Sequence, residues 1–107
     1  MAGVVQETLS LAQITRREVE LYAGDCLNCT LYPVLDDDHQ TYAVILVAEN
    51  DHPVWALVMA QVVGDTVIII EDTTDKPLVD ALMINGGVPR DKIVLAYKGE
   101  KKPESSP

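Results

Sequence analysis

The chain has 107 residues, 48% of them hydrophobic, which fits a single domain with one modest core. Seventeen acidic residues against eight basic ones give a net charge of −9, so a general affinity for the phosphate backbone of nucleic acids is not expected. If the protein works near DNA, we expect it to do so through another protein. Its longest apolar runs are far below the roughly 18 residues of a membrane span, and no cationic segment leads into them, so we expect a cytoplasmic protein.

The first segment has the spacing of an amphipathic helix. Its apolar residues recur every three or four positions, which predicts a helix over about residues 5–22. Two stretches, beginning at Ser10 and at Thr15, match the spacing of a capping box, so the start stays open. Gly24 is the expected C-cap.

After Gly24 the pattern changes to extended segments. The stretches "CTLYPVL", "TYAVILVAE", "VWALVMAQVV" and "TVIIIED" are separated by the turn signals "DDDH", "ENDHP" and "VGD". This order predicts a four-stranded antiparallel meander. Pro33 lacks a backbone donor, so the first strand is expected at an edge or with a bulge there. The middle strands are continuously apolar and therefore need cover on both faces.

A second, short helix and a last strand complete the predicted domain. The helix is expected to start at Thr73 or Thr74, with Pro77 near its first turn, and to stop at "GGVP". The stretch "KIVLAY" is a short final strand. The fold class is therefore α+β, with one domain over residues 1–99 and a disordered polar tail over 100–107.

The segment Val62–Gly99 carries a family resemblance. Its end reads Gly-Val-Pro-Arg-Asp-Lys-Ile-Val-Leu-Ala-Tyr from Gly87 to Tyr97, preceded by a Gly-Asp-Thr turn and a D-x-T element. This resembles the C-terminal half of the XisI family, the controlling factors of fdxN-element excision, and the order of the whole chain fits that family. The chain departs from the family pattern at Ala48-Glu49, where a Gly-Trp pair is usual.

The resemblance implies an accessory role. Members of the family act beside a nuclease-like companion, XisH, and the resemblance provides no set of catalytic residues to map onto this chain. It therefore implies a non-enzymatic regulatory protein that contacts a nuclease- or recombinase-like partner.

Cys26 and Cys29 form a C-x-x-C motif with three interpretations. Redox catalysis of the thioredoxin type needs this motif at the N-terminus of a helix, whereas here it follows a helix. A zinc site needs two more ligands, and His39 and His52 lie in two different turns. We therefore favour a structural role, with Cys29 on one face of a strand and Cys26 in the connection before it.

Two acidic clusters allow a metal-binding or acid–base interpretation. The first is Asp36–Asp38 with His39, and the second is Glu71–Asp72 with Asp75. Neither matches an EF-hand loop, and solvated turns need such residues. We favour solvated turns and predict no catalytic residue, no metal site and no cofactor. A small metal-binding or hydrolytic enzyme that uses these Asp and His residues is the alternative.

The apolar strands predict contacts with other proteins. Two short helices cannot cover both faces of such a sheet, so we expect a homodimer, with a nuclease-like companion as a second possible partner. The residues predicted for the interaction surface are Trp55, Leu57, Met59 and Ile69.

Overall fold

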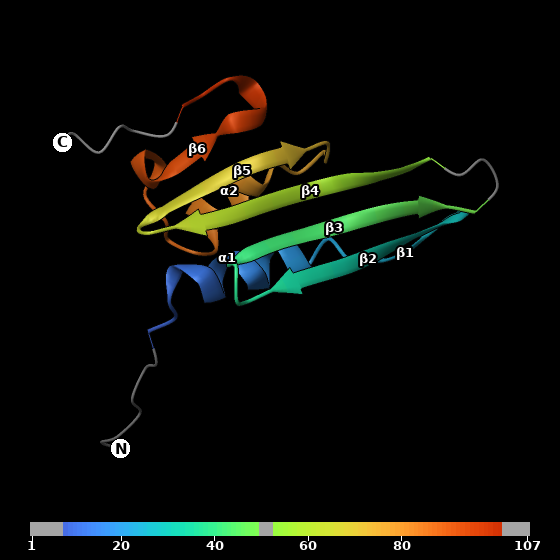
Figure 1. Cartoon of the computed structure of the whole chain (residues 1–107), viewed down its shortest axis with the longest axis horizontal. Helices are drawn as coiled ribbons and strands as arrows, with labels where there is room; N and C mark the ends of the chain where they lie inside the picture. Colours follow the sequence, from blue (N-terminus) through green and yellow to red (C-terminus); the bar gives the residue numbers. More distant parts are fainter. Residues whose placement is uncertain (1–7, 50–52, 102–107) are drawn as a thin grey trace, which may run out of the picture.

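The computed structural model describes residues 8–49 and 53–101, and within them the chain forms one mixed sheet with two α-helices (Figure 1). In chain order the elements are α1 (Leu11–Glu20), β1 (Gly24–Cys26), β2 (Cys29–Asp36), β3 (Thr41–Ala48), β4 (Val54–Val63), β5 (Thr66–Asp72), α2 (Leu78–Ile84), the 3-10 turn η1 (Arg90–Lys92), β6 (Ile93–Leu95) and the 3-10 turn η2 (Ala96–Lys98). The strands lie side by side in the order β1 to β6, and every neighbouring pair is antiparallel except β5 and β6. The predicted α+β architecture is confirmed, with β1 as an additional strand.

Helix α1 begins at a capping box. The Ser10 hydroxyl accepts the N–H of Gln13 at 3.1 Å, and the Gln13 side chain accepts the N–H of Ser10 at 2.8 Å. Of the two predicted starts, the structure therefore uses the first. Residues 8–10 are not helical, so the predicted start at residue 5 is wrong, and residues 1–7 lie outside the described part.

The end of α1 differs from the prediction. The helix ends with Leu21 as its C-cap, in a right-handed conformation. Gly24 begins strand β1 instead, with φ 145°. The glycine therefore serves the entry into a strand and does not cap the helix.

Both helices pack on the same face of the sheet. Helix α1 lies against β2, β3 and β4, while α2 lies against β5 and against α1 (Figure 1). Between these layers lies the core, which includes Val19, Tyr42, Val44, Val58, Ala60, Val62, Val67, Ile69, Leu78 and Leu82. The right-hand ends of β2, β3 and β4 in Figure 1 extend well past α1.

Strand β2 has a partly free edge. Strand β1 pairs with it only from Cys29 to Leu31, so Pro33 lies beyond the reach of β1. A residue without an N–H is compatible with this position, because no ladder hydrogen bond is needed there. The prediction that this strand lies at an edge therefore holds at Pro33, although β1 covers the other end of β2.

A bulge in β4 anchors the loop that leads to α2. The register moves from Val44 opposite Val58 to Ile45 opposite Ala56, which leaves Leu57 as an extra residue. The carbonyl of Leu57 accepts the N–H of Thr73 at 2.8 Å and its hydroxyl at 3.0 Å. The chain after β5 is thereby tied to the neighbouring strand.

Helix α2 starts later than predicted and stops where predicted. Its first residue is Leu78, with Pro77 as N-cap, and residues 73–76 form a loop. At the other end Gly87 has φ 67°, and the N–H of Val88 donates to the carbonyl of Leu82 at 3.0 Å. The predicted stop at the glycine pair is confirmed.

The C-terminal segment is tied down beyond the last strand. Glu100, which the sequence places in the tail, accepts the N–H of Leu95 at 2.8 Å and a guanidinium N–H of Arg90 at 2.8 Å. The rest of the predicted tail, at 102–107, lies outside the described residues. None of the helices within the described ranges is long and apolar enough to cross a membrane.

Candidate functional site

The face of the sheet opposite the two helices carries apolar side chains that no described segment covers. Side chains alternate along each strand, so the neighbours of core residues point to this second face. Val34 is 50% exposed and Tyr32 52% exposed, while Leu31 and Leu35 on the same strand pack against the core. We call this surface the bare face; it includes Tyr32, Val34, Ile45, Val54, Met59, Ile68 and Ile70.

The bare face is typical of a protein contact. It runs across four neighbouring strands, β2 to β5, with the polar residues Gln61 and Glu71 on its β4–β5 side. Continuous apolar patches of this extent are uncommon on monomeric proteins.

A second apolar surface lies on the helix side, where β2, β3 and β4 extend past α1. Leu31, Leu46 and Trp55 are opposite one another across these three strands, and Trp55 is 42% exposed. We call Leu31, Leu46, Trp55 and Leu57 the arm surface. An open cavity of about 380 Å³ adjoins it, lined by Tyr22, Leu31, Leu57 and residues 73–76.

Tyr22 forms the wall of this cavity on the α1 side. Its hydroxyl donates to the carbonyl of Lys76. Partial burial, and after it the charge of Asp72, raises the pKa of Tyr22. The phenol is therefore neutral at physiological pH, and it joins the end of α1 to the loop before α2.

The four residues predicted for an interaction surface do not share one surface. Ile69 is fully buried between the sheet and the helices, so it is unavailable to a partner of the folded domain. Met59 lies on the bare face, whereas Trp55 and Leu57 belong to the arm surface. The cause is the bulge at Leu57, which changes the side-chain alternation along β4.

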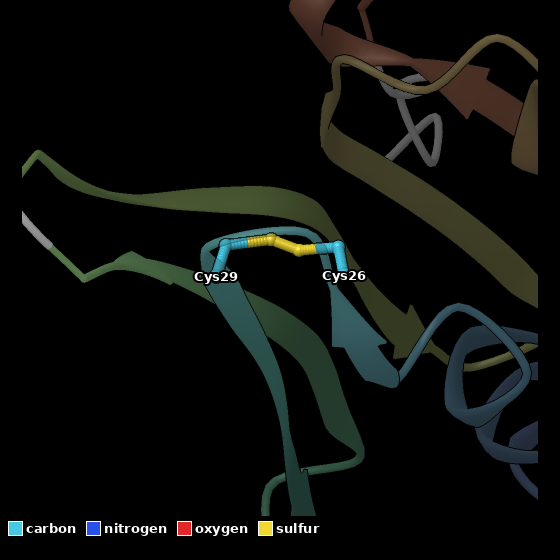
Figure 2. Close-up of a disulfide and its surroundings, with 2 residues drawn as sticks. All are labelled: Cys26 and Cys29. Carbon is cyan, nitrogen blue, oxygen red and sulfur yellow. A yellow bond between two sulfur atoms is a disulfide. The ribbon is translucent and has the colours of Figure 1, made fainter.

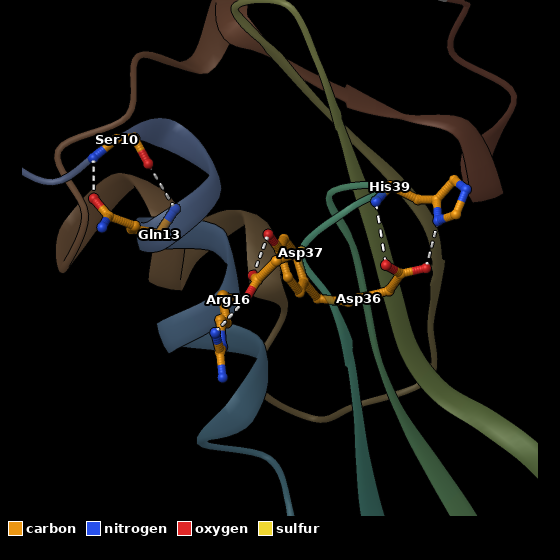
Figure 3. A network of polar contacts seen from close by, with 7 residues as sticks. Ser10, Gln13, Arg16, Asp36, Asp37 and His39 are labelled. Atoms are coloured by element: carbon orange, nitrogen blue, oxygen red, sulfur yellow. Dashed lines mark hydrogen bonds and ion pairs between the residues drawn. The ribbon is translucent and has the colours of Figure 1, made fainter.

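The first acidic cluster is a hydrogen-bonded turn (Figure 3). Asp36 accepts the N–H of His39 at 3.2 Å and lies 2.7 Å from its Nδ1. The backbone N–H of His39, and then its side chain, lower the pKa of Asp36. Asp37 accepts hydrogen bonds from Arg16 at 2.6 Å and from the Tyr42 hydroxyl at 3.0 Å, which connects this turn to α1.

These contacts favour the solvated-turn interpretation over the metal-binding or hydrolytic one. His39 is 78% exposed, and its ring has Asp36 as its acidic partner. The described ranges, 8–49 and 53–101, contain no group of three His, Cys, Asp or Glu side chains arranged to hold a metal ion. His52, the other predicted candidate, lies outside these ranges.

The second acidic cluster positions α2. One oxygen of Asp72 accepts the N–H of Leu78 at 2.6 Å, and the other accepts the N–H of Thr74 at 2.9 Å and its hydroxyl. Asp72 is therefore the side-chain cap of α2, although it lies six residues before the helix. The sequence signal for this role was the Asp-x-Thr spacing, which is typical of an Asx turn.

The structure brings Cys26 and Cys29 together as a disulfide (Figure 2). Cys26 belongs to strand β1 and is the cross-strand partner of Cys29 on β2. The prediction that Cys26 lies in a connection is therefore wrong. The strand was missed because Gly24-Asp25-Cys26 is short and lacks an apolar pattern.

The comparisons with known proteins agree on one family. The family model "XisI protein" matches residues 4–106. The chain belongs to the XisI family. The predicted resemblance is thereby confirmed.

Two solved structures share the fold. An XisI-like protein from Anabaena variabilis has a TM-score of 0.69 and 18% identity, over 86% of this chain and 85% of its own. The fdxN element excision controlling factor XisI from the same organism has a TM-score of 0.55 and 18% identity, over 83% of this chain and 80% of its own. Comparison with curated proteins gives no significant match.

Proposed function

We propose that this XisI family chain is a cytoplasmic, non-catalytic accessory protein that regulates a DNA-processing partner by direct contact. The observation that carries the proposal is uncovered apolar surface on both sides of the sheet, at the bare face and at the arm surface. A relative with the same fold bears the name fdxN element excision controlling factor, which describes control of the excision of an element.

Electrostatics support contact with a partner that itself binds DNA. A net charge of −9 opposes direct association with the phosphate backbone. The same charge attracts a basic protein and speeds the encounter with it. A nuclease- or recombinase-like protein must carry a basic surface to hold its DNA, so its charge complements that of this chain.

We assign the arm surface to this partner. Trp55 is exposed on this surface, which also includes Leu31 and Leu57 from the lining of the open cavity, and tryptophan is enriched in the buried centre of protein interfaces. The cavity accepts an inserted side chain between Tyr22 and Leu57. This leaves the bare face for a second copy of the chain.

The test compares Trp55→Ala with Ile84→Ala. Ile84 is 80% exposed on α2, so its replacement removes an apolar side chain elsewhere. The chain is crosslinked to its neighbours in its native cells, and proteins recovered with wild type but not with Trp55→Ala are purified. Each is then mixed with the chain and a DNA substrate. We expect to recover a nuclease- or recombinase-like protein whose rate of DNA cleavage or rearrangement changes when wild type or Ile84→Ala is added.

Two results would contradict the proposal. One is cleavage or rearrangement of DNA by the purified chain alone. The other is a recovered DNA-processing protein that binds wild type and Trp55→Ala equally well and whose activity changes equally with both. Urea unfolding first checks that Trp55→Ala and Ile84→Ala are folded.

A further inference from the structure

The two cysteines stand at the tip of an exposed edge hairpin. Cys26 and Cys29 are cross-strand partners with Cα atoms 5.0 Å apart, joined by a two-residue turn. Leu27 in this turn is 92% exposed, and Asn28 has φ 61°. All three residues of β1 are exposed, and neither cysteine belongs to the hydrophobic core.

In this position the disulfide contributes little to the stability of the fold. A crosslink stabilises a fold mainly by removing entropy from the unfolded chain, and the gain falls as the closed loop becomes shorter. Here the disulfide closes a loop that runs only from Cys26 to Cys29, which is among the shortest loops that a disulfide can close. The β1–β2 register places the two residues opposite each other along a hydrogen-bonded strand pair, so we expect the fold to persist without the bond.

The same position makes the disulfide accessible. Thiol–disulfide exchange requires an attacking thiolate to reach a sulfur atom, and strand β1 is the edge of the sheet with exposed residues along its length. Cys26 is exposed and Cys29 is half-buried, so Cys26 is the more open target. Disulfides of cytosolic proteins are usually transient or redox-sensing, which fits a bond of this kind.

We propose that Cys26 and Cys29 form a reversible redox site that exchanges with dithiols. In reduction, a thiolate of the dithiol attacks Sγ of Cys26, and the Cys29 thiolate leaves. The second thiol of the dithiol then attacks the first sulfur of the same dithiol, which is bonded to Sγ of Cys26 in the mixed disulfide. This step releases the Cys26 thiolate and leaves the dithiol oxidised as a cyclic disulfide. Two electrons and two protons pass to the cysteine pair, and the reverse sequence restores the disulfide.

The site differs from that of thioredoxin in its setting. There, a helix N-terminus stabilises the first thiolate. Here the motif spans a β-hairpin, and its immediate neighbour Asp25 is acidic. We therefore assign this chain the role of a substrate of thiol–disulfide exchange that responds to its redox surroundings and does not catalyse exchange in other proteins.

The test is a redox titration of the purified full chain. The protein is equilibrated in mixtures of reduced and oxidised dithiothreitol, free thiols are alkylated, and intact mass is measured. We expect one two-electron transition in which both cysteines become alkylated together. Oxidised and reduced forms should have nearly the same urea midpoint.

Single variants compare how accessible each of the two sulfur atoms is, with the remaining cysteine as a free thiol. With oxidised glutathione, the variant Cys29→Ser should accumulate a mixed disulfide on Cys26 faster than Cys26→Ser accumulates one on Cys29. Equal rates would contradict the inference that the Cys26 sulfur is the more accessible of the two.

Three outcomes would overturn the redox site. In the first, both thiols are alkylated even in the most oxidising buffer, so no disulfide forms. In the second, the bond survives the most reducing buffer or its reduction unfolds the protein, so it is a structural crosslink. In the third, alkylation releases one equivalent of zinc, so the pair is part of a metal site.

Discussion

Asp72 is a single side chain on which the position of a helix depends. Its carboxylate accepts hydrogen bonds from the N–H groups of Leu78 and Thr74. Because Leu78 is fully buried, Asp72→Ala leaves its N–H without a partner, and we expect a loss of about 1–3 kcal/mol in the free energy of unfolding. Asp72→Asn keeps one acceptor oxygen and should lose less.

Asp75→Ala is the matched control for this prediction. Asp75 is exposed in the same loop, so its replacement removes a negative charge without removing the cap. Urea unfolding at neutral pH measures all three variants. A loss for Asp75→Ala as large as that for Asp72→Ala would mean that charge, and not capping, controls the stability of this loop.

Glu100 is a second single residue on which stability depends, and its contribution should change with pH. The N–H of Leu95, and after it the guanidinium of Arg90, hold the pKa of Glu100 below its ordinary value. A lowered acid pKa contributes stability that is fully present above the ordinary value and is lost as the pH falls through the lowered one. Glu100→Gln should therefore be less stable than wild type at neutral pH, and this difference should shrink as the solution is acidified.

Urea midpoints measured between pH 7 and pH 3 check the prediction for Glu100. Glu20→Gln, an exposed change on α1, is the control. A difference between wild type and Glu100→Gln that stays constant across the acid range would contradict a role for the ionised carboxylate.

The end of α2 depends on two adjacent glycines for two different reasons. A Cβ on Gly87 would meet nothing within 4 Å, but the residue has φ 67°, so Gly87→Ala should cost about 1–2 kcal/mol through backbone strain. A Cβ on Gly86 would lie 2.6 Å from Cγ2 of Ile14 and 2.7 Å from the carbonyl oxygen of Leu82. Gly86→Ala should therefore push α1 away from α2 and cost at least as much.

Asparagine separates the two causes. It tolerates the left-handed conformation, so Gly87→Asn should recover part of the stability that Gly87→Ala loses. Gly86→Asn should recover none relative to Gly86→Ala, because its Cβ meets the same atoms. Thermal or urea unfolding of the four variants gives the answer, and an equal recovery at both positions would contradict the contact with Ile14.

Local patterns predicted the elements well, and long-range contacts account for the differences. The alternation and turn signals identified the four long strands, because each strand has enough residues to show its period. Strand β1 has only three residues and exists through its pairing with β2. The start of α2 is set by the carboxylate of Asp72, and the buried position of Ile69 depends on registers that no single strand reveals. For the candidate site, the apolar strands predicted that some apolar surface of the sheet stays uncovered by the helices. They did not show which face of the sheet carries that surface.

At the scale of the whole molecule, the bare face predicts a twofold homodimer. Four strands about 4.8 Å apart and some eight residues long give a face of roughly 19 by 27 Å. Two such faces bury about 1,000 Å², which reaches the lower limit of a specific interface. The face is largely apolar, with Gln61 and Glu71 at its β4–β5 side, and it presents the same side chains from each copy, as a twofold contact requires.

The charge of the chain gives this dimer a distinctive salt dependence. Two copies of net charge −9 repel each other, and added salt screens that repulsion within about 10 Å at 0.1 M. Salt does not weaken the apolar contact itself, so we expect the dissociation constant to fall as NaCl increases. An interface held by ion pairs would show the opposite trend.

Light scattering over a concentration series, at low and high salt, tests the dimer with a pair of matched variants. Val34→Lys places a charge in the bare face and should yield a monomer of about 11.7 kDa, because a buried unpaired ammonium is costly. Ile84→Lys adds the same charge on α2, outside the bare face, and should remain a dimer. A wild-type chain that stays at 11.7 kDa at every concentration and salt level would contradict self-association. The bare face would then be free for a second contact with the DNA-processing partner, and Val34→Lys would weaken that contact in addition to Trp55→Ala.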